Sequence, residues 1–322
     1  MNAGNAKMKQ RTRENLMQYI SPLAVILLVI VFRSISKSFL SVKNIRNLLV
    51  DVGPLLVAAC AVSFIIQLGS IDLSVGNVIS CTSITIAVII GRLGIWSFPA
   101  VICYGLFTGL LNGWIFIQFQ VPSFIVTMAT MSIWQSTAYL ISASPQLIPT
   151  DRWPLVNWLR WKVGIVSTPI LIGLGVVVLC YFIQRFTVLG KSAYAVGVNE
   201  TAARLAGIKV RKVKMLSFML CGLLCSVAGI MLTANMRTGT PTIGNEYGLM
   251  SIAAVALGGS SLSGGRGNSL NTLLGALLVT LIGNGMTIIA VDAFWRDVVF
   301  GVLVIVAICI TSDRSNLRAV VK

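Results

Sequence analysis

The amino-acid sequence predicts an all-α integral membrane protein with about ten transmembrane helices. Of its 322 residues, 56% are hydrophobic and only 11% are charged, and the mean hydropathy is +0.90. Uncharged apolar runs of about twenty residues, the length that crosses a bilayer, recur from one end of the chain to the other. No segment between these runs is long enough for a soluble domain, so we expect residues 1–322 to form a single transmembrane domain.

The apolar runs define the predicted spans in chain order. The first run follows a basic stretch and resembles a signal peptide, but no small-residue cleavage site comes after it, and many more runs do. We therefore interpret it as a transmembrane helix like the others. The spans are residues 17–32, 48–68, 73–91, 95–118, 121–141, 165–184, 215–235, 249–263, 270–290 and 297–312.

The distribution of basic residues predicts the orientation, because cytoplasmic loops carry an excess of Lys and Arg. The chain has 25 Lys and Arg against 9 Asp and Glu. Placing the basic N-terminus inside puts the strongly basic loop 185–214 and the basic C-terminal tail inside as well, so both termini are expected to be cytoplasmic. The four cations within residues 33–46 fit less well, since they would lie outside. The tryptophan-rich loop before residue 165 also lies outside, where we expect an aromatic belt or a re-entrant or amphipathic element.

The composition argues against an enzyme. Histidine is absent, which removes the commonest general base, the usual zinc ligand and any Ser-His-Asp arrangement. The seven cysteines all fall within apolar stretches and are interpreted as small buried hydrophobes. We therefore expect no catalytic residue and no metal site, and we attribute the basic excess to cytoplasmic loops rather than to nucleic-acid binding.

The basic loop contains a short predicted helix. Asn199 can cap a turn that runs from Glu200 to Ala206, Glu200 lies at the positive end of its dipole, and Gly207 ends it. Such a helix is too short to cross a membrane, but it suits a groove on a cytoplasmic partner. The alternative is an ordinary solvated loop.

The same loop does not bind ATP. Residues 190–192 resemble the end of a phosphate-binding loop, but Arg185 stands where that motif requires a glycine. If transport is driven by ATP, the nucleotide site must lie on another subunit.

A second notable segment, residues 67–77, interrupts two apolar runs and places Asp72 at membrane depth. A charge there is costly unless it is satisfied. In one interpretation, Asp72 or Ser74 caps a helix that begins at Leu73 at the cytoplasmic surface. In the other, the interrupted segment lines a translocation path.

A third segment, residues 252–267, is rich in small residues and predicts close helix packing. Its Arg266 would contact a partner or a helix C-terminus. Elsewhere, amides and aromatics inside spans are candidates for recognising a polar ligand; most are expected to be packing residues, and Trp134 with Gln135 is the best pair for a sugar face and its hydroxyls. The candidate path residues are Gln67, Asp72, Ser74, Asn112, Phe124, Trp134 and Gln135.

Four segments together resemble the permease subunits of ribose-type sugar ATP-binding cassette importers, a group with ribose, arabinose, xylose and galactoside systems. Residues 69–76 are similar to the family's GGIDLSVG, and residues 121–127 to its VPAFIATL. Residues 194–208 resemble YAIGGNxxAARLSGI, and residues 262–267 match as well. The resemblance covers nearly the whole chain, in order.

This resemblance implies an importer permease of the bacterial inner membrane, surrounded by lipid and paired with a second permease chain, most simply as a homodimer. It implies a periplasmic substrate-binding protein outside and ATP-binding cassette subunits inside, with ATP and Mg on those subunits and no cofactor on this chain. The loop 185–214 then corresponds to the segment that couples the permease to the ATPase. The coupling residues are Tyr194, Asn199, Glu200, Ala202, Ala203, Arg204 and Gly207.

The sequence departs from the family pattern at several positions. Ser70 and Val198 stand in place of glycines, and residues 247–254 lack both acids of the family's YELDAIAA stretch. For this reason we do not name a single sugar. The competing class is an ion-coupled secondary transporter of a polar solute, for which Asp51 and Asp72 are the clear intramembrane ionisable candidates.

Overall fold

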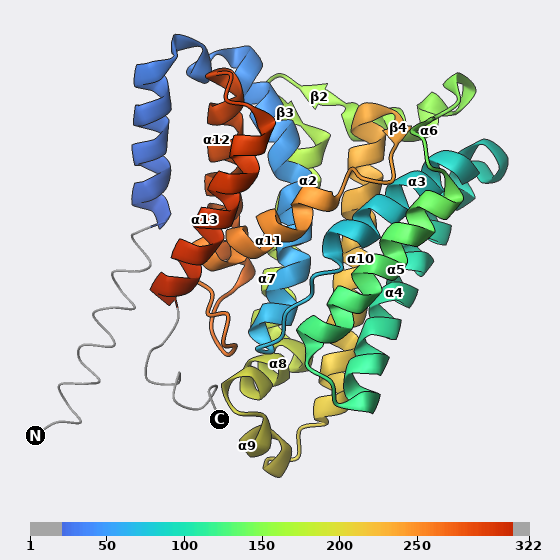
Figure 1. The fold of residues 1–322 in the computed structure, drawn as a ribbon, viewed down its shortest axis with the longest axis vertical. Helices are drawn as coiled ribbons and strands as arrows, with labels where there is room; N and C mark the ends of the chain where they lie inside the picture. Colours follow the sequence, from blue (N-terminus) through green and yellow to red (C-terminus); the bar gives the residue numbers. More distant parts are fainter. Residues whose placement is uncertain (1–20, 312–322) are drawn as a thin grey trace, which may run out of the picture.

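The computed structural model describes residues 21–311, which fold mainly into helices (Figure 1). The predictions for the basic N-terminus, the first residues of span 17–32 and the C-terminal tail lie outside these residues. The long helices are Ser21–Ile35, α2 (Val42–Gln67), α3 (Val75–Leu93), α4 (Ser97–Phe119), α5 (Ser123–Ile141), α7 (Thr168–Phe186), α10 (Val210–Met236), α11 (Asn245–Leu257), α12 (Ser269–Ile288) and α13 (Ala293–Thr311).

Helix α2 forms the centre of the bundle (Figure 1). From residue 52 onward its sequence is mainly apolar on every face, and nearly every residue from Val50 to Gln67 is buried, as expected for a helix surrounded by protein. Its neighbours are α7, α10, α11 and α12. The polar break that follows Gln67 therefore lies among other helices rather than in a surface loop.

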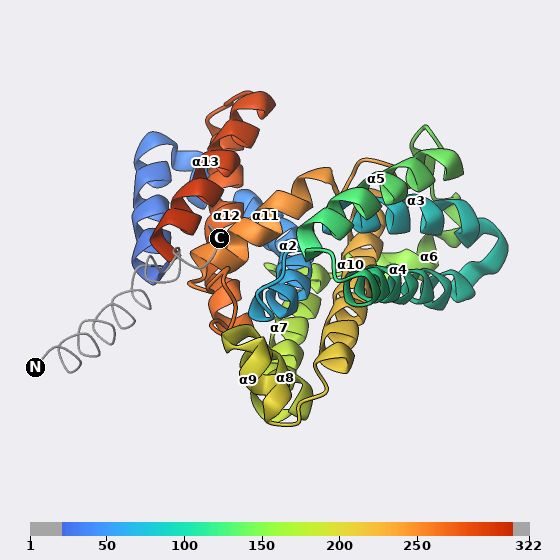
Figure 2. The same ribbon diagram turned by 60° about the horizontal axis from the view of Figure 1, so that its bottom comes forward.

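Helices α4 and α10 pack with their backbones in direct approach, side by side in both views (Figures 1 and 2). A Cβ on Gly105 would collide with the carbonyl oxygen of Gly222, and one on Gly109 with that of Phe218. Small residues at this interface allow the close packing by which membrane helices associate. The contact fixes α10, which carries the chain up from the basic loop, against the α3–α4–α5 group.

The two ends of the bundle differ. One end carries α8 (Val188–Val198) and α9 (Glu200–Leu205). Helix α8 packs against α7, and α9 packs against α8 and the start of α10 (Figure 2). The other end carries a cap of short elements (Figure 1). In this cap β1 (Gln146–Leu147) pairs antiparallel with β4 (Thr238–Gly239), and β2 (Lys162–Val163) pairs with β3 (Val166–Ser167). The remaining short elements are η1 (Lys37–Leu40), η2 (Gly94–Trp96), η3 (Thr150–Arg152), α6 (Trp153–Asn157) and η4 (Trp158–Arg160).

The described residues contain six candidate membrane spans, so the prediction of about ten is not confirmed. One of the six, Val75–Phe119, holds both α3 and α4, which η2 joins. The predicted span 249–263 is wrong as a crossing: α11 has 13 residues, about 20 Å of helix, which is shorter than the roughly 30 Å of hydrocarbon. The chain turns after Leu257, where Gly259 has a φ of +88°.

Candidate functional site

The break between α2 and α3 holds a buried carboxylate. Asp72 is 4% exposed, and its Oδ1 accepts hydrogen bonds from the backbone N–H of Ser74 at 2.8 Å and from the Ser74 hydroxyl at 2.6 Å. Asn112 of α4 donates to that same hydroxyl oxygen at 2.8 Å. No side chain caps the first turn of α3, however, so the expected cap by Asp72 is not formed. The expected position of Asp72 at the surface is also wrong, because α4, α5 and α10 surround the break, and α3 begins at Val75 rather than at Leu73.

The backbone of the break is held by hydroxyl groups of α5. Ser123 Oγ accepts from the N–H of Ile71 at 3.0 Å, and Thr127 Oγ1 accepts from the N–H of Leu73 at 3.1 Å. Inside a membrane, non-helical backbone persists only where such groups are satisfied within the protein. This requirement links two of the sequence motifs. Residues 69–76 contain the non-helical backbone, and residues 121–127 supply the hydroxyl groups that accept its hydrogen bonds. Sequence reasoning missed both residues, although two hydroxyls four residues apart on one helix face were a usable signal.

Trp134 and Gln135 contact different neighbours. Trp134 is buried in edge-to-face contact with Tyr104 and Phe107, and its indole N–H has no acceptor among the described residues. Gln135 accepts a hydrogen bond from Asn77 of α3 and donates to the carbonyl oxygen of Pro241 at 2.9 Å. Their joint recognition of a sugar stays a prediction. Phe124, near the start of the same helix α5, is 46% exposed.

The basic loop folds as the local sequence signals predict. The side chain of Asn199 accepts from the N–H of Ala202 at 2.9 Å, α9 runs from Glu200 to Leu205, and Gly207 has a φ of +83°. Ala203 is buried, whereas Ala202 and Arg204 are exposed. Tyr194 is 49% exposed and Leu205 is 85% exposed. Leu205 thus presents an apolar side chain to the surroundings, whereas the half-exposed Tyr194 lines a pocket with Gln67 and Tyr181.

Glu200 fastens α9 to the foot of α10. Its carboxylate accepts from Lys214 Nζ at 2.7 Å and from Arg204 Nη2 at 2.9 Å. Partial burial raises the pKa of Glu200, but the hydrogen bonds and charges of Lys214 and Arg204 outweigh burial, so the pKa lies below its usual value. The carboxylate is therefore ionised at neutral pH and holds both cations.

Glycines bring the three notable segments of the sequence together. We call the contact between Gly69, Gly197, Gly264 and Gly265 the glycine junction. Gly265 donates its N–H to the carbonyl oxygen of Gln67 at 3.0 Å, and a Cβ on Gly197 would collide with that same oxygen. A Cβ on Gly264 would lie 2.7 Å from the nitrogen of Gly69 and 2.9 Å from the carbonyl oxygen of Gly197. The basic loop, the break after α2 and the turn before α12 therefore meet through their backbones.

A second cationic feature lies at the opposite end of the bundle, in a pocket of about 450 Å³ beside β2 and β3. Arg160, Lys162 and Arg237 line it, together with the buried hydroxyl of Ser167, which has no partner among the described residues. Arg237 stacks over Trp153 at 3.7 Å. Desolvation and the charge of Arg237 lower the pKa of Arg160. We call this cavity the outer basic pocket.

A bundle with six candidate membrane spans among the described residues, interrupted by a buried polar break, has the architecture of an integral membrane protein. The chain belongs to the family described as "Branched-chain amino acid transport system / permease component", which matches residues 44–308.

Several relatives match along almost their full lengths. The chain is 36% identical over 323 residues to the probable ABC transporter permease protein YphD of Escherichia coli (strain K12), covering 96% of each chain. It is 33% identical over 310 residues to the ribose import permease protein RbsC of the same organism, covering 94% of this chain and 96% of the relative. The RbsC of Bacillus subtilis (strain 168) is 34% identical over 316 residues, covering 94% and 95%. No solved structure matches the chain significantly.

These relationships place the chain among the permease components of ATP-binding cassette transporters, a family of inner-membrane permeases. The resemblance inferred from the sequence motifs is thereby confirmed. The family is a transport component, which agrees with the expectation that this chain is not an enzyme. The ion-coupled alternative finds no support in these relatives.

Proposed function

We propose that the chain imports a monosaccharide across the bacterial inner membrane, with the ATP and Mg bound by a separate cassette subunit. The sugar is supported by the two RbsC relatives, whose names specify ribose import. The family description names branched-chain amino acids instead, so the family alone does not specify the cargo. The altered stretch 247–254 is our reason for leaving the particular sugar open.

The glycine junction is the observation that carries the mechanism. ATP-driven closure of the cassettes displaces α8 and α9, and Gly197 passes that displacement directly to the carbonyl of Gln67. From Gln67 the chain runs into the break, whose N–H groups rest on Ser123 and Thr127 of α5. Movement of the basic element thus shifts the break and α5 together, and no covalent chemistry takes place on this chain.

The exposed side of α8 and α9 serves as the docking surface for the cassette subunit. Tyr194 and Leu205 offer apolar contacts, and Arg204 offers a charge at the rim. Three further residues support this surface without forming part of it. The first turn of α9 is capped by Asn199, its end is fixed by Gly207, and its buried side packs on the bundle through Ala203. Ala202 and Glu200 complete the element, the latter through its ion pairs.

Helix α5 provides the surface for a second copy of the chain. It is the least buried of the six candidate spans and has the lowest mean hydropathy, and it exposes Ser132 and Ser136. Lipid tails offer hydroxyl groups no partner, whereas a polar path between two copies does. We place Phe124 and the exposed serines along that path. The buried side chains of Asp72, Ser74 and Asn112 hydrogen-bond to one another and stabilise the wall of the path.

The outer basic pocket provides a contact for the periplasmic binding protein. Its three cations have no acidic residue among the side chains that line the cavity. Acidic side chains on a partner would both pair with them and reduce the repulsion between Arg160 and Arg237. This orientation puts the α8–α9 end and both termini in the cytoplasm, with lipid around the bundle.

Uptake into proteoliposomes that contain the chain and its cassette subunit tests the proposal. The cargo panel comprises labelled pentoses, hexoses, nucleosides and leucine, each measured with and without ATP and binding protein. We expect uptake of one sugar that requires both. Uptake of leucine alone would contradict the proposal that the cargo is a sugar. Uptake driven by an imposed ion gradient without ATP would contradict the proposal that ATP drives transport.

A further inference from the structure

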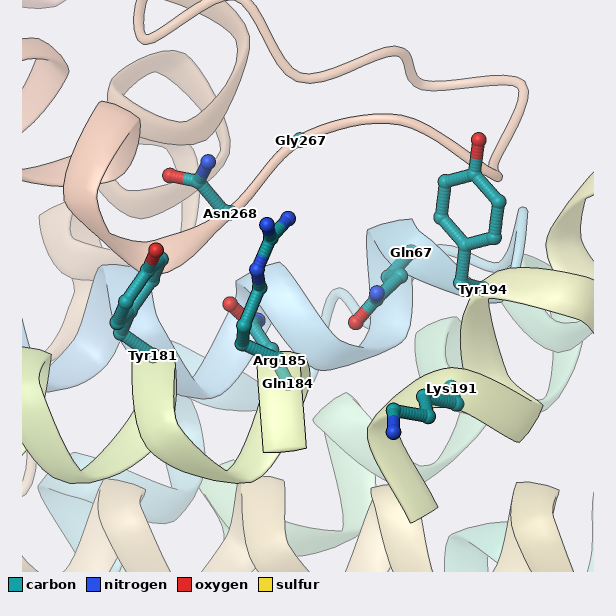
Figure 3. Close-up of a pocket in the computed structure, with 8 residues that line it drawn as sticks. All are labelled: Gln67, Tyr181, Gln184, Arg185, Lys191, Tyr194, Gly267 and Asn268. Atoms are coloured by element: carbon teal, nitrogen blue, oxygen red, sulfur yellow. The ribbon is translucent and has the colours of Figure 1, made fainter. Parts of the chain in front are cut away.

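A cavity of about 530 Å³ opens where four segments meet at the α8–α9 end of the bundle. Figure 3 shows Tyr181 and Arg185 at the end of α7, Gln67 at the end of α2, and Tyr194 on α8. The segment of Gly267 and Asn268 forms the remaining wall, and the Arg185 side chain extends towards it (Figure 3). The volume suits a small organic ligand.

Two cations of this cavity carry uncompensated charge. Arg185 and Lys191 line it, and neither forms an ion pair within residues 21–311. The 20-residue helix α12 begins at the cavity wall, directly after Asn268. The N–H groups of Ser269 and Asn271 are already bonded to Gln184 and Asn268, so this helix end contributes the positive end of its dipole rather than free donors. All three features favour an anion, and phosphate is the group that a helix N-terminus and two cations suit best.

One buried acceptor in the cavity wall is free to bond a ligand that donates a hydrogen bond. Gln67 is 5% exposed, it lines the cavity, and its Oε1 has no hydrogen-bond partner among the described residues. An unpaired buried acceptor is unfavourable, so a ligand hydroxyl at this position would be favourable. Inorganic phosphate as a dianion has little capacity to donate there. The phenols of Tyr181 and Tyr194 add further partners for hydroxyls.

The neighbouring amide, Gln184, forms a fixed wall. Its Nε2 donates to Ser63 at 3.1 Å, and its Oε1 accepts from the N–H and the hydroxyl of Ser269 at 2.8 and 2.9 Å. This amide therefore joins α7 to α2 and to the start of α12, and its hydrogen-bonding capacity is largely used. The cavity is thus preorganised on one side and leaves Gln67, Arg185 and Lys191 to meet a ligand.

We propose that this cavity binds a phosphate ester of a polyol, with the phosphate on Arg185 and Lys191 and a hydroxyl on Gln67. Two sources share this chemistry: a soluble sugar phosphate of the cytoplasm, and the glycerol phosphate headgroup of an inner-leaflet phosphatidylglycerol. Either ligand would connect Gln67 to α8. The carbonyl group of Gln67 is part of the contact that forms the glycine junction. Occupancy therefore ties the basic loop to the core of the bundle.

Binding is measured with the full chain and its cassette subunit in nanodiscs. In the first arm the nanodisc lipid is phosphatidylcholine. Ribose 5-phosphate is titrated into the nanodiscs, ribose and inorganic phosphate are titrated for comparison, and calorimetry measures the binding of each. In the second arm phosphatidylglycerol is added to the nanodisc, and retained lipid is detected by native mass spectrometry. Signal in the first arm assigns the soluble source, and signal in the second assigns the lipid.

Variants decide whether the signal comes from this cavity. Arg185→Gln and Gln67→Met should each weaken binding about tenfold, the effect of losing a charged or a buried hydrogen bond. Lys209→Gln, which removes an exposed cation of the same loop outside the cavity, should leave binding within about twofold. Absence of binding in both arms overturns the proposal, as does binding that Arg185→Gln and Gln67→Met leave unchanged. Since no transport is measured, this outcome is independent of the proposed cargo.

Discussion

The backbone of Gly197 lies against the carbonyl oxygen of Gln67, 130 positions earlier in the chain, with no room for a side chain between them. Gly265 donates its N–H to that same oxygen. The carbonyl group of Gln67 therefore contacts both the basic loop and the turn before α12. This contact makes the proposed coupling testable with small substitutions.

Gly197→Ala should disrupt the glycine junction. The added methyl group must displace backbone rather than a flexible side chain, so we expect a loss of about 1–3 kcal/mol of stability and uncoupling of ATP hydrolysis from uptake. Thermal unfolding in detergent and the ratio of ATP hydrolysed to sugar transported measure the two effects. Gly175→Ala on α7, where nothing lies within 4 Å of the added atom, is the matched control and should be neutral or slightly stabilising. Equal behaviour of the two variants would contradict the junction's role.

Thr127→Val should destabilise the break before α3. The substitution keeps the shape of the side chain but removes the acceptor for the N–H of Leu73, at a cost of about 1–3 kcal/mol. Thr137→Val is the control, because that hydroxyl bonds only to a carbonyl of its own helix. Chemical or thermal unfolding of both variants provides the comparison. If Thr137→Val costs as much as Thr127→Val, the hydroxyl of α5 does not support the break.

Asp72→Asn should retain uptake, whereas Asp72→Ala should lose it. Asparagine keeps an oxygen that can accept from the N–H of Ser74, while alanine leaves that N–H and the Asn112–Ser74 contact without support. Uptake is assayed with ATP held constant and the proton gradient dissipated by an uncoupler. Uptake that fails in Asp72→Asn and on addition of the uncoupler would restore the ion-coupled alternative.

Glu200→Gln should loosen α9. Because the Glu200 side chain is 40% exposed, each ion pair contributes less than about 1 kcal/mol, so the effect falls on coupling rather than on folding. Its folded-state pKa is lowered, so the contribution is present above the usual glutamate pKa and is lost as pH falls through the lowered value. ATPase stimulation by the binding protein at pH 7 measures the coupling. Full activity and assembly in a Glu200→Ala, Arg204→Ala double variant would contradict the coupling role.

Met128→Cys on α5 should cross-link two copies of the chain. Met128 is exposed on the helix that we assign to the dimer interface. Val178→Cys on α7, equally exposed on an apolar span, should not cross-link because that face meets lipid. Both variants are made in a Cys103→Ser background, since Cys103 is an exposed native thiol, and are examined by oxidation and gel electrophoresis in membranes. Preferential cross-linking through Val178→Cys would move the interface to α7.

The parts of the structure that sequence could predict are those with local causes. Asn199 and Gly207 define α9 because capping and a positive φ depend on a few neighbouring residues. Seven of the predicted spans correspond to α2, α3, α4, α5, α7, α10 and α12, which make up the six candidate membrane spans, for the same reason, since each is a continuous apolar run. The span 249–263 was wrong because its uncharged run continues through Gly258 and Gly259, whereas the φ of +88° at Gly259 turns the chain away after α11.

The contacts that organise the site could not be predicted, because they join residues far apart in the chain. Each of the three notable segments was recognised by its own composition, but nothing local indicates that Gly69, Gly197 and Gly264 share one contact. Likewise, the hydroxyls of Ser123 and Thr127 have ordinary intrahelical roles until the break is placed beside them.

The burial of residues 52–67 of α2 has a consequence for how the protein is made. Its neighbours α7, α10, α11 and α12 all follow it by 100 residues or more, so during synthesis α2 enters the membrane long before the helices that will surround it. It must first be stable in lipid alone, which the mainly apolar surface of residues 52–67 permits. The central helix is therefore inserted into the bilayer first, and its neighbours can pack around it only after the second half of the chain has been synthesised.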